Sequence, residues 1–208
     1  MYRLYWAKDS GAIAPQVLFE EIGAKYEKIV IDFESEENRS AEFLAVNPTG
    51  QIPALILPDG TLMTESAAMV LQIVDCHPEA KLAPPPASPE RAIFQRWLLF
   101  MAATLYTTDL RLYYPDRFTT DPDGVEGVAA AALADMDRAF SILNEALHPG
   151  PYLLGETFSA ADIYLWMLTQ WHPDPTQMSE WNPRIGRLVD LVQARPAVER
   201  VWAQHGGD

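Results

Sequence analysis

Cysteine is almost absent from this chain of 208 residues. Its single cysteine, Cys76, excludes an internal disulfide and any Cys-x-x-Cys motif of a redox or zinc site. The four histidines are scattered, and no pair has the spacing of a His-Glu-x-x-His motif. We therefore expect no metal site.

Positive charge is also scarce, with 15 Lys and Arg against 29 Asp and Glu, and no basic cluster occurs. The formal net charge of −14 disfavours nucleic acid and anionic membranes as partners. No apolar run approaches the ~20 residues that cross a bilayer. The first five residues lack the apolar core and cleavage site of a signal peptide, so we expect a cytoplasmic protein.

The remaining composition is that of a folded chain, with 49% apolar and 21% charged residues. Its length allows one large domain or two small ones. Residues 1–76 alternate strand-like and helix-like segments, and five prolines break the segment 77–89. Beyond it, residues 90–208 show helical patterns alone. We therefore expect an α/β domain, a linker and an all-α domain.

The elements of the first domain are expected in the order β-α-β-α-β-β-α. They are strand 2–6, a helix from Ile13 that stops at Gly23, strand 26–31, helix 40–46, a hairpin of 54–57 with 61–63, and helix 65–76. The expected helices of the second domain span 90–115, 126–147, 159–171, 184–194 and 197–204. Ser159 and Asp162 have the spacing of a capping box, which is a folding device and no catalytic site.

The segment "VNPTGQIPAL", residues 46–55, places Pro53 directly before an apolar strand. A proline at a strand's first position cannot donate to the ladder. If the Ile52–Pro53 bond is cis, the chain turns sharply, and the N–H and C=O of Ile52 are free to pair with a ligand that presents backbone-like groups. The alternative is a proline-rich turn that binds nothing.

Three motifs, "NPTGQIPAL" (47–55), "TESAAMVLQIV" (64–74) and "GETFSAADIYL" (155–165), occur in this order. Together they resemble the cytosolic glutathione transferases, and the chain looks like a bacterial serine-type member. The resemblance covers the chain end to end. It implies a thioredoxin-like domain over 1–76 that binds glutathione, a linker over 77–89, and a helical domain over 90–208 that binds the electrophile.

The resemblance also implies the activity. The enzyme would activate the glutathione thiol for attack on small apolar electrophiles, as a detoxifying homodimer that uses glutathione as co-substrate and no metal. A non-catalytic module of the same fold, which binds glutathione or a hydrophobic ligand, is the alternative.

In this family the residue before the cis-proline, here Ile52, pairs its backbone with the cysteinyl main chain of glutathione. Glu65 would hold the ammonium of the γ-glutamyl end, and the hydroxyl of Ser66 with the N–H groups of a helix start suits its carboxylate. An ordinary helix N-terminus is the alternative for this pair.

Gln51 stands where many family members carry Lys or Arg to hold the glycine carboxylate of glutathione. It can donate a hydrogen bond but supplies no charge. Asn38 and Arg39 occupy positions from which some members reach the same carboxylate. The affinity for glutathione is therefore left open.

Ser10 and Tyr5 are the candidates for lowering the thiol pKa from its ordinary value of ~8.5. Ser10 lies where the first strand leads into the first helix, so its hydroxyl and the helix N–H groups would both stabilise a thiolate. This spacing is similar to that of the serine-type transferases, and we favour it. Ser10 as a simple helix cap, or Tyr5 as in the tyrosine-type members, are the alternatives.

An apolar second substrate would need an apolar wall. Tyr106, Leu110 and Tyr113 recur at helical spacing, and Trp6 can add to such a wall. Aromatic residues at this spacing also occur in ordinary cores, so the sequence does not decide between pocket and core.

Overall fold

The computed structural model describes residues 1–147 and 149–206. These residues form two compact units. The first comprises Met1–Leu82 together with the segment that begins at Ala194, and the second comprises Ala83–Gln193. The sequence analysis grouped residues 90–208 in one helical domain, whereas the last helix packs within the first unit.

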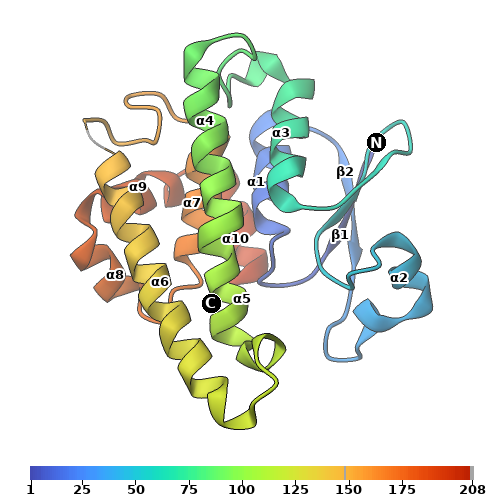
Figure 1. Ribbon diagram of the computed structural model, residues 1–208. Helices are drawn as coiled ribbons and strands as arrows, with labels where there is room; N and C mark the ends of the chain where they lie inside the picture. The colour runs from blue at the N-terminus through green and yellow to red at the C-terminus, as the bar shows by residue number, and fades with distance from the viewer. Residues whose placement is uncertain (148, 207–208) are drawn as a thin grey trace. The chain divides into compact units, whose positions relative to one another are not determined.

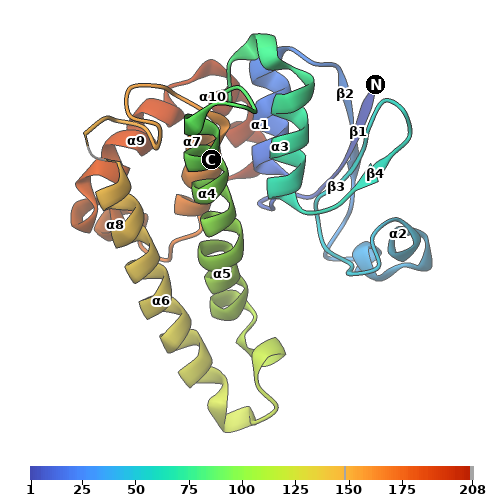
Figure 2. The same cartoon turned by 45° about the horizontal axis from the view of Figure 1, so that its top comes forward.

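The first unit is built on a four-stranded sheet of order β2-β1-β3-β4. Strand β1 pairs in parallel with β2 and antiparallel with β3, which pairs antiparallel with β4. Helices α1 and α3 lie on one face of the sheet, and α2 lies on the other (Figures 1 and 2). The elements of this unit are β1 (Tyr2–Trp6), α1 (Ile13–Ile22), β2 (Tyr26–Val30), α2 (Ala41–Val46), β3 (Ala54–Ile56), β4 (Leu62–Met63), α3 (Ser66–Cys76) and α10 (Pro196–His205), with short 3₁₀ turns at Glu37–Arg39 and Pro78–Ala80.

Helix α1 is buried along most of its length, since it packs against α3 and α10. Alternation along β1 directs Tyr2, Leu4 and Trp6 into the core and Tyr5 to the opposite face. At the end of α1, Nε and Nη2 of Arg195 each donate to one oxygen of the Glu21 carboxylate at 2.7 Å. This bidentate pair fastens the chain at the start of α10 to α1.

The described part of the second unit is helical, apart from two isolated β-bridges that join Tyr152 to Gly155 and Leu154 to Thr157. Its central helix α7 is buried at every residue and packs against α4 and α9, while α6 packs along α5. The elements are α4 (Pro89–Phe100), a π-helical turn (Met101–Leu105), α5 (Tyr106–Tyr113), α6 (Val125–Ala146), α7 (Ala160–Thr169), α8 (Pro175–Trp181) and α9 (Pro183–Gln193), with 3₁₀ turns at Pro115–Phe118 and Pro122–Gly124.

Two expectations for the second unit were wrong in detail. The helix expected over 90–115 is interrupted by the π-helical turn, and α8 was not expected at all. Proline stands at the first position of α8, where its fixed φ is tolerated, so the Pro-containing stretch "HPDP" concealed the helix start.

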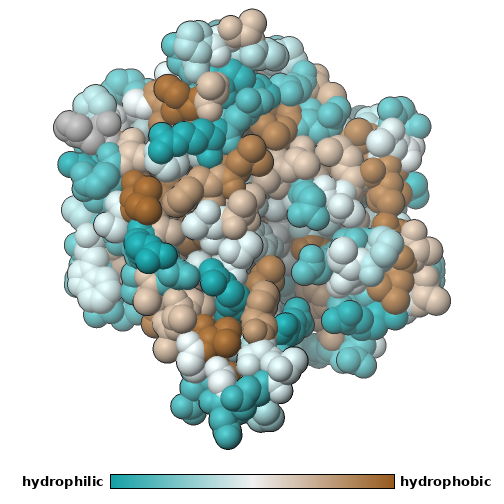
Figure 3. All heavy atoms as spheres, in the orientation of Figure 1, coloured by the Kyte–Doolittle hydropathy of each residue, from teal (hydrophilic) through white to brown (hydrophobic). Residues whose placement is uncertain are grey.

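The surface of the molecule carries hydrophobic residues interspersed with hydrophilic ones on the face that includes α4 and α6 (Figure 3). Among the helices of the described residues, none is long and apolar enough to cross a membrane. Within residues 1–147 and 149–206, no group of three or more His, Cys, Asp or Glu side chains is arranged to hold a metal ion.

Candidate functional site

The loop before β3 has an unpaired main chain at one residue. The Ile52–Pro53 peptide bond is cis, as predicted. Asn47 Nδ2 donates to the carbonyl of Gln51 at 2.7 Å. Next in the chain, the N–H and C=O of Ile52 make no hydrogen bond to any described residue. A ligand with peptide-like groups can satisfy both.

The start of α3 lies at the end of the sheet where Ile52 and Pro53 precede β3. Met63 of β4 pairs with Leu55 of β3, and because the strands are antiparallel the chain leaves β4 in the direction of Pro53. Glu65 follows at φ 65° and ψ 103°, an uncommon conformation for a residue with a side chain, and Ser66 opens α3. Such a residue costs about 1–3 kcal/mol and often marks a ligand site.

Glu65 is exposed, and its side chain makes no capping hydrogen bond to α3. Ser66 is 8% exposed. The N–H groups of the first turn of α3 point away from the helix, as at every helix start. The Glu65 carboxylate can bind an ammonium group of a ligand, while the N–H groups of the helix start can donate to a ligand carboxylate.

Ser10 lies in the loop between β1 and α1, and it is 9% exposed. Its Oγ donates to the carbonyl of Ala7 at 2.8 Å and accepts from the N–H of Ala12 at 3.3 Å. A serine hydroxyl has one proton, so Ser10 must turn away from Ala7 to donate to a sulfur atom. The helix cap position itself is Ala12, so Ser10 stabilises the preceding turn.

Tyr5 points to the face of the sheet on which Phe43 lies, and the two ring centroids are 5.6 Å apart. Its hydroxyl makes no hydrogen bond to any residue that the structure describes. Tyr5 pairs with Ala54, two residues after Ile52, so it lies at the end of the sheet that carries the unpaired main chain. The β1–α1 loop with Ser10 leaves β1 at this same end.

Arg39 brings a positive charge to this loop. Its Nη1 would be 3.4 Å from a Cβ added to Gly50, whose φ of 67° disfavours any side chain. Asn38 Nδ2 donates to the carbonyl of Gly50 at 2.9 Å and holds the two segments together. The neighbouring side chain of Gln51 is exposed. Arg39 therefore lies beside Gly50, the residue directly before Gln51.

Trp6 does not form an exposed wall. It is 8% exposed, and its Nε1 donates to Gln16 Oε1 at 2.6 Å inside the first unit. The Lys28 ammonium lies 4.5 Å from the centre of its ring. This burial leaves Trp6 little surface for an electrophile.

The aromatic residues expected in the electrophile pocket are on α5 in the second unit. The Tyr106 ring meets Trp171 edge to face at 5.3 Å, and the Tyr113 hydroxyl donates to the Trp171 carbonyl at 2.5 Å. Leu110 is half-buried on the same helix, while Tyr113 is 50% exposed. Tyr106 and Tyr113 are thus held in place by a common partner.

The sequence analysis missed Asp109, which lies between these tyrosines on α5. Asp109 is 6% exposed, and neither carboxylate oxygen has a hydrogen-bond partner among the described residues. Burial raises the pKa of Asp109 to about 8. An acidic residue on the apolar side of a helix was the signal that could have revealed it.

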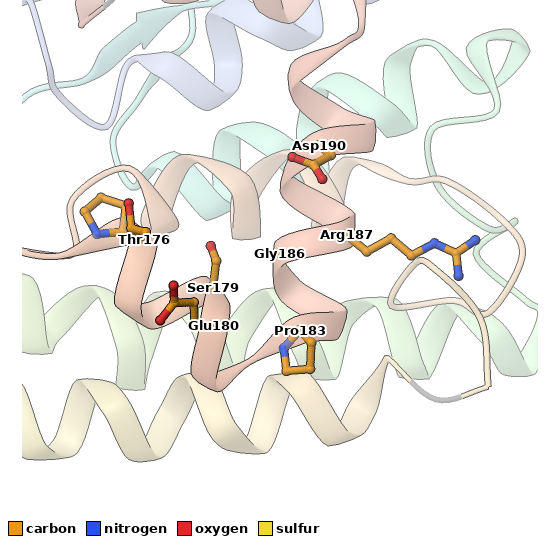
Figure 4. A pocket seen from close by; sticks show the side chains of 8 residues that line it. Thr176, Ser179, Glu180, Pro183, Gly186, Arg187 and Asp190 are labelled. Atoms are coloured by element: carbon orange, nitrogen blue, oxygen red, sulfur yellow. The ribbon is translucent and has the colours of Figure 1, made fainter.

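An open groove of about 620 Å³ lies between α8 and α9. Ser179 of α8 points toward α9 and lies 3.3 Å from a Cβ added to Gly186 (Figure 4). The lining contains no residue predicted to bind substrate. The groove comprises Pro175, Thr176, Ser179, Glu180, Pro183, Gly186, Arg187 and Asp190.

The sheet of the first unit, with a cis-proline before β3 and a helix starting beside it, defines a thioredoxin-like unit. Joined to an all-helical second unit, it has the glutathione transferase fold. The family model described as "Glutathione S-transferase, N-terminal domain" matches residues 2–74, and "Glutathione S-transferase, C-terminal domain" matches residues 126–201. The chain belongs to the glutathione S-transferase family.

Individual relatives extend over almost the whole chain. It is 29% identical to the uncharacterised GST-like protein YncG of Escherichia coli K12, over 97% of each chain. It is 26% identical to the glutathione S-transferase GstA of Escherichia coli O157:H7, over 98% of each. A crystal structure of a glutathione transferase homologue from Sulfitobacter with bound glutathione superimposes with a TM-score of 0.89 at 27% identity, covering 97% of this chain and 96% of that one.

Proposed function

We propose that this glutathione transferase uses Ser10 to activate the thiol of glutathione for attack on small apolar electrophiles. The observation that carries the proposal is the unpaired N–H and C=O of Ile52, beside the loop that carries Ser10. The cysteinyl main chain of glutathione supplies the complementary pair of groups. Pairing there directs the cysteinyl side chain to the β1–α1 loop.

The two ends of glutathione are assigned to separate groups. Glu65 accepts hydrogen bonds from the γ-glutamyl ammonium, and Ser66 with the first N–H groups of α3 binds the adjacent carboxylate. Arg39, aided by Gln51 and with Asn38 bracing the loop, binds the glycine carboxylate. Three anchor points along one tripeptide fix the position of its sulfur atom.

Ser10 acts as a hydrogen-bond donor to the thiolate. When glutathione binds, the hydroxyl turns from Ala7 to the sulfur and keeps its bond from the Ala12 N–H. The N–H groups at the start of α1 add to the favourable field. Donation to the charged form lowers the thiol pKa, so that more thiolate is present near pH 7.

The electrophile-binding residues proposed on α5 are Tyr106, Leu110 and Tyr113, without Trp6. We assign the protein to the cytoplasm, where it detoxifies apolar electrophiles as a homodimer. Exposed Ile93 and Leu99 of α4 and Ile142 of α6 are apolar side chains that a second copy would cover.

The decisive experiment is a titration of bound glutathione, following ultraviolet thiolate absorbance against pH. Ser10→Ala should raise the thiol pKa by about one to two units, since one charge-assisted hydrogen bond contributes roughly 1.5–3 kcal/mol. Turnover near pH 7 should fall roughly 10- to 100-fold and recover in part at higher pH. Ser35→Ala, at an exposed serine of the same unit, is the matched control and should change neither.

Tyr5→Phe tests the alternative donor. If Tyr5→Phe alone moves the thiol pKa, Tyr5 is the activating residue and the assignment of Ser10 is wrong. If neither substitution moves it and no turnover is found, the second candidate function applies, namely a glutathione carrier without catalysis. The Ser10 hydroxyl already engaged with Ala7 is the observation that favours this candidate.

A further inference from the structure

His205, in the last turn of α10, reaches the loop that carries Ser10 although it lies 196 residues from Asp9 in the chain. It is 1% exposed. The backbone N–H of Asp9 donates to His205 Nδ1 at 3.0 Å. Both residues belong to the first unit. This contact holds the residue directly before Ser10.

The surrounding hydrogen bonds determine which ring nitrogen of His205 carries the proton. Because Nδ1 accepts from Asp9, the proton of the neutral ring is on Nε2, which donates to Gln16 Oε1 at 2.9 Å. The indole N–H of Trp6 donates to the same oxygen at 2.6 Å. Gln16 Nε2 in turn donates to Gln204 Oε1 at 3.1 Å. The Trp6 indole nitrogen also lies 2.9 Å from His205 Nε2, and with the proton on Nε2 the hydrogen bond of Trp6 goes to Gln16 Oε1 instead. A neutral His205 thus leaves the N–H groups of Asp9 and Trp6 each with an acceptor.

The backbone of the loop needs such support. Asp9 has a φ of 52°, in the left-handed region that residues with a side chain seldom adopt. A partly buried hydrogen bond to its N–H favours this conformation over the alternatives. The position of Asp9 sets where the chain directs Ser10, the next residue.

We propose that His205 is a positioning residue for thiol activation, which holds the β1–α1 loop through Asp9 so that the Ser10 hydroxyl can face the glutathione sulfur. This inference rests on the role proposed for Ser10. His205 touches no substrate and acts through the loop alone. It also assigns a task in the reaction to the C-terminal helix.

Burial and two nearby lysines keep His205 neutral. Lys8 comes from the β1–α1 loop, Lys28 from β2, Glu20 from α1 and Arg200 from α10, the last two paired at 3.2 Å. Burial, then Lys28 and Lys8, lower the pKa of His205 to about 4. Protonation would place an N–H on Nδ1 opposite the N–H of Asp9. The contact is therefore intact at neutral pH and lost as the pH falls toward 4.

Two substitutions separate the two sides of the ring. In His205→Asn the side-chain oxygen can take the place of Nδ1 and accept from Asp9, whereas in His205→Gln the side-chain amide can take the place of Nε2 and retain the Gln16 contact. We expect His205→Gln to raise the thiol pKa of bound glutathione by roughly half to one unit, with a loss of turnover near pH 7 of about 3- to 10-fold. His205→Asn should recover most of this shift. The dissociation constant of glutathione should change less than twofold in both.

The combination with Ser10→Ala decides between the two proposals. In the Ser10→Ala background, His205→Gln should produce no further shift of the thiol pKa. If Ser10→Ala shifts the pKa and His205→Gln does not, or if His205→Asn and His205→Gln behave alike, the positioning role is overturned and the role of Ser10 stands. If Ser10→Ala itself leaves the pKa unchanged, the role of Ser10 fails and the role of His205 fails with it.

Discussion

Glu65 has an unfavourable φ, and we propose that it binds glutathione. Its proposed partner is the ammonium of glutathione, and a charge-assisted hydrogen bond contributes roughly 1.5–3 kcal/mol. Glu65→Gln keeps the shape and removes the charge, so we expect glutathione affinity to fall about 10- to 100-fold by calorimetry. Glu36→Gln is a matched control, because Glu36 is also exposed and has a positive φ of 56°. Equal affinity in both variants would contradict the assignment.

The burial of Asp109 predicts how the free energy of unfolding depends on pH. Its pKa is raised by burial from 3.8 to about 8, so the folded state disfavours ionisation. The contribution to the free energy of unfolding is fully retained below pH 4 and is lost as the pH rises through about 8. Asp109→Asn cannot ionise and should be more stable than the native chain above pH 8, on the order of a few kcal/mol.

Urea unfolding of the native chain and Asp109→Asn at several pH values measures this difference. Asp116→Asn, at an exposed aspartate just after α5, is the control and should keep the native pH dependence. A native stability that stays constant between pH 5 and 9 relative to Asp109→Asn would show that Asp109 has a partner in solution.

Among the helices, α7 depends on its N-terminal turn. Asp162 accepts hydrogen bonds from the N–H of Leu153 at 2.8 Å, the N–H of Ser159 at 2.7 Å and the Ser159 hydroxyl at 3.0 Å. Asp162→Ala leaves two buried N–H groups without an acceptor and should reduce the free energy of unfolding by roughly 3 kcal/mol or more. Ser159→Ala removes a hydroxyl alone and should cost about 1 kcal/mol.

Chemical denaturation of both variants measures the ranking. An equal loss of stability in Asp162→Ala and Ser159→Ala would mean that the hydroxyl contact carries the whole effect. Because the capping box is a folding device, turnover per folded molecule should be unchanged in both variants.

Elements with strong local signals could be predicted from the sequence. The end of α1 follows from Gly23, which adopts φ 67° at the helix terminus. The capping box of α7 was likewise confirmed. The π-helical turn after α4 and the short helix α8 were missed, because packing rather than local propensity sets a π turn and a proline-initiated helix of seven residues has little periodicity.

The candidate site was predictable only to the extent that its residues are neighbours in the chain. Ile52, Pro53, Glu65 and Ser66 stand in short recognisable motifs. His205 does not, since no spacing relates it to Asp9, and its role follows from the packing of α10 on α1. For Trp6 the sequence left pocket and core open, because exposure cannot be read from residue type.

The whole molecule is proposed to be a homodimer, which predicts its mass in solution. Sedimentation at micromolar concentration should give twice the chain mass of 23.3 kDa. Leu99 is 54% exposed on α4, so Leu99→Glu should weaken association by placing charge on the surface to be covered. A native chain that sediments at the mass of one copy would contradict the dimer.

The return of α10 to the first unit bears on how such genes can recombine. A crossover in the region between α3 and α4 would exchange the sheet and α1 but leave α10 behind. The new sheet would then meet a terminal helix that had not evolved with it, and the contacts that Arg195 makes with Glu21 and His205 makes with Asp9 would have to be formed between sequences of different origin. Productive exchange between relatives therefore requires the first third and the last dozen or so codons to be inherited together, as two pieces of one module.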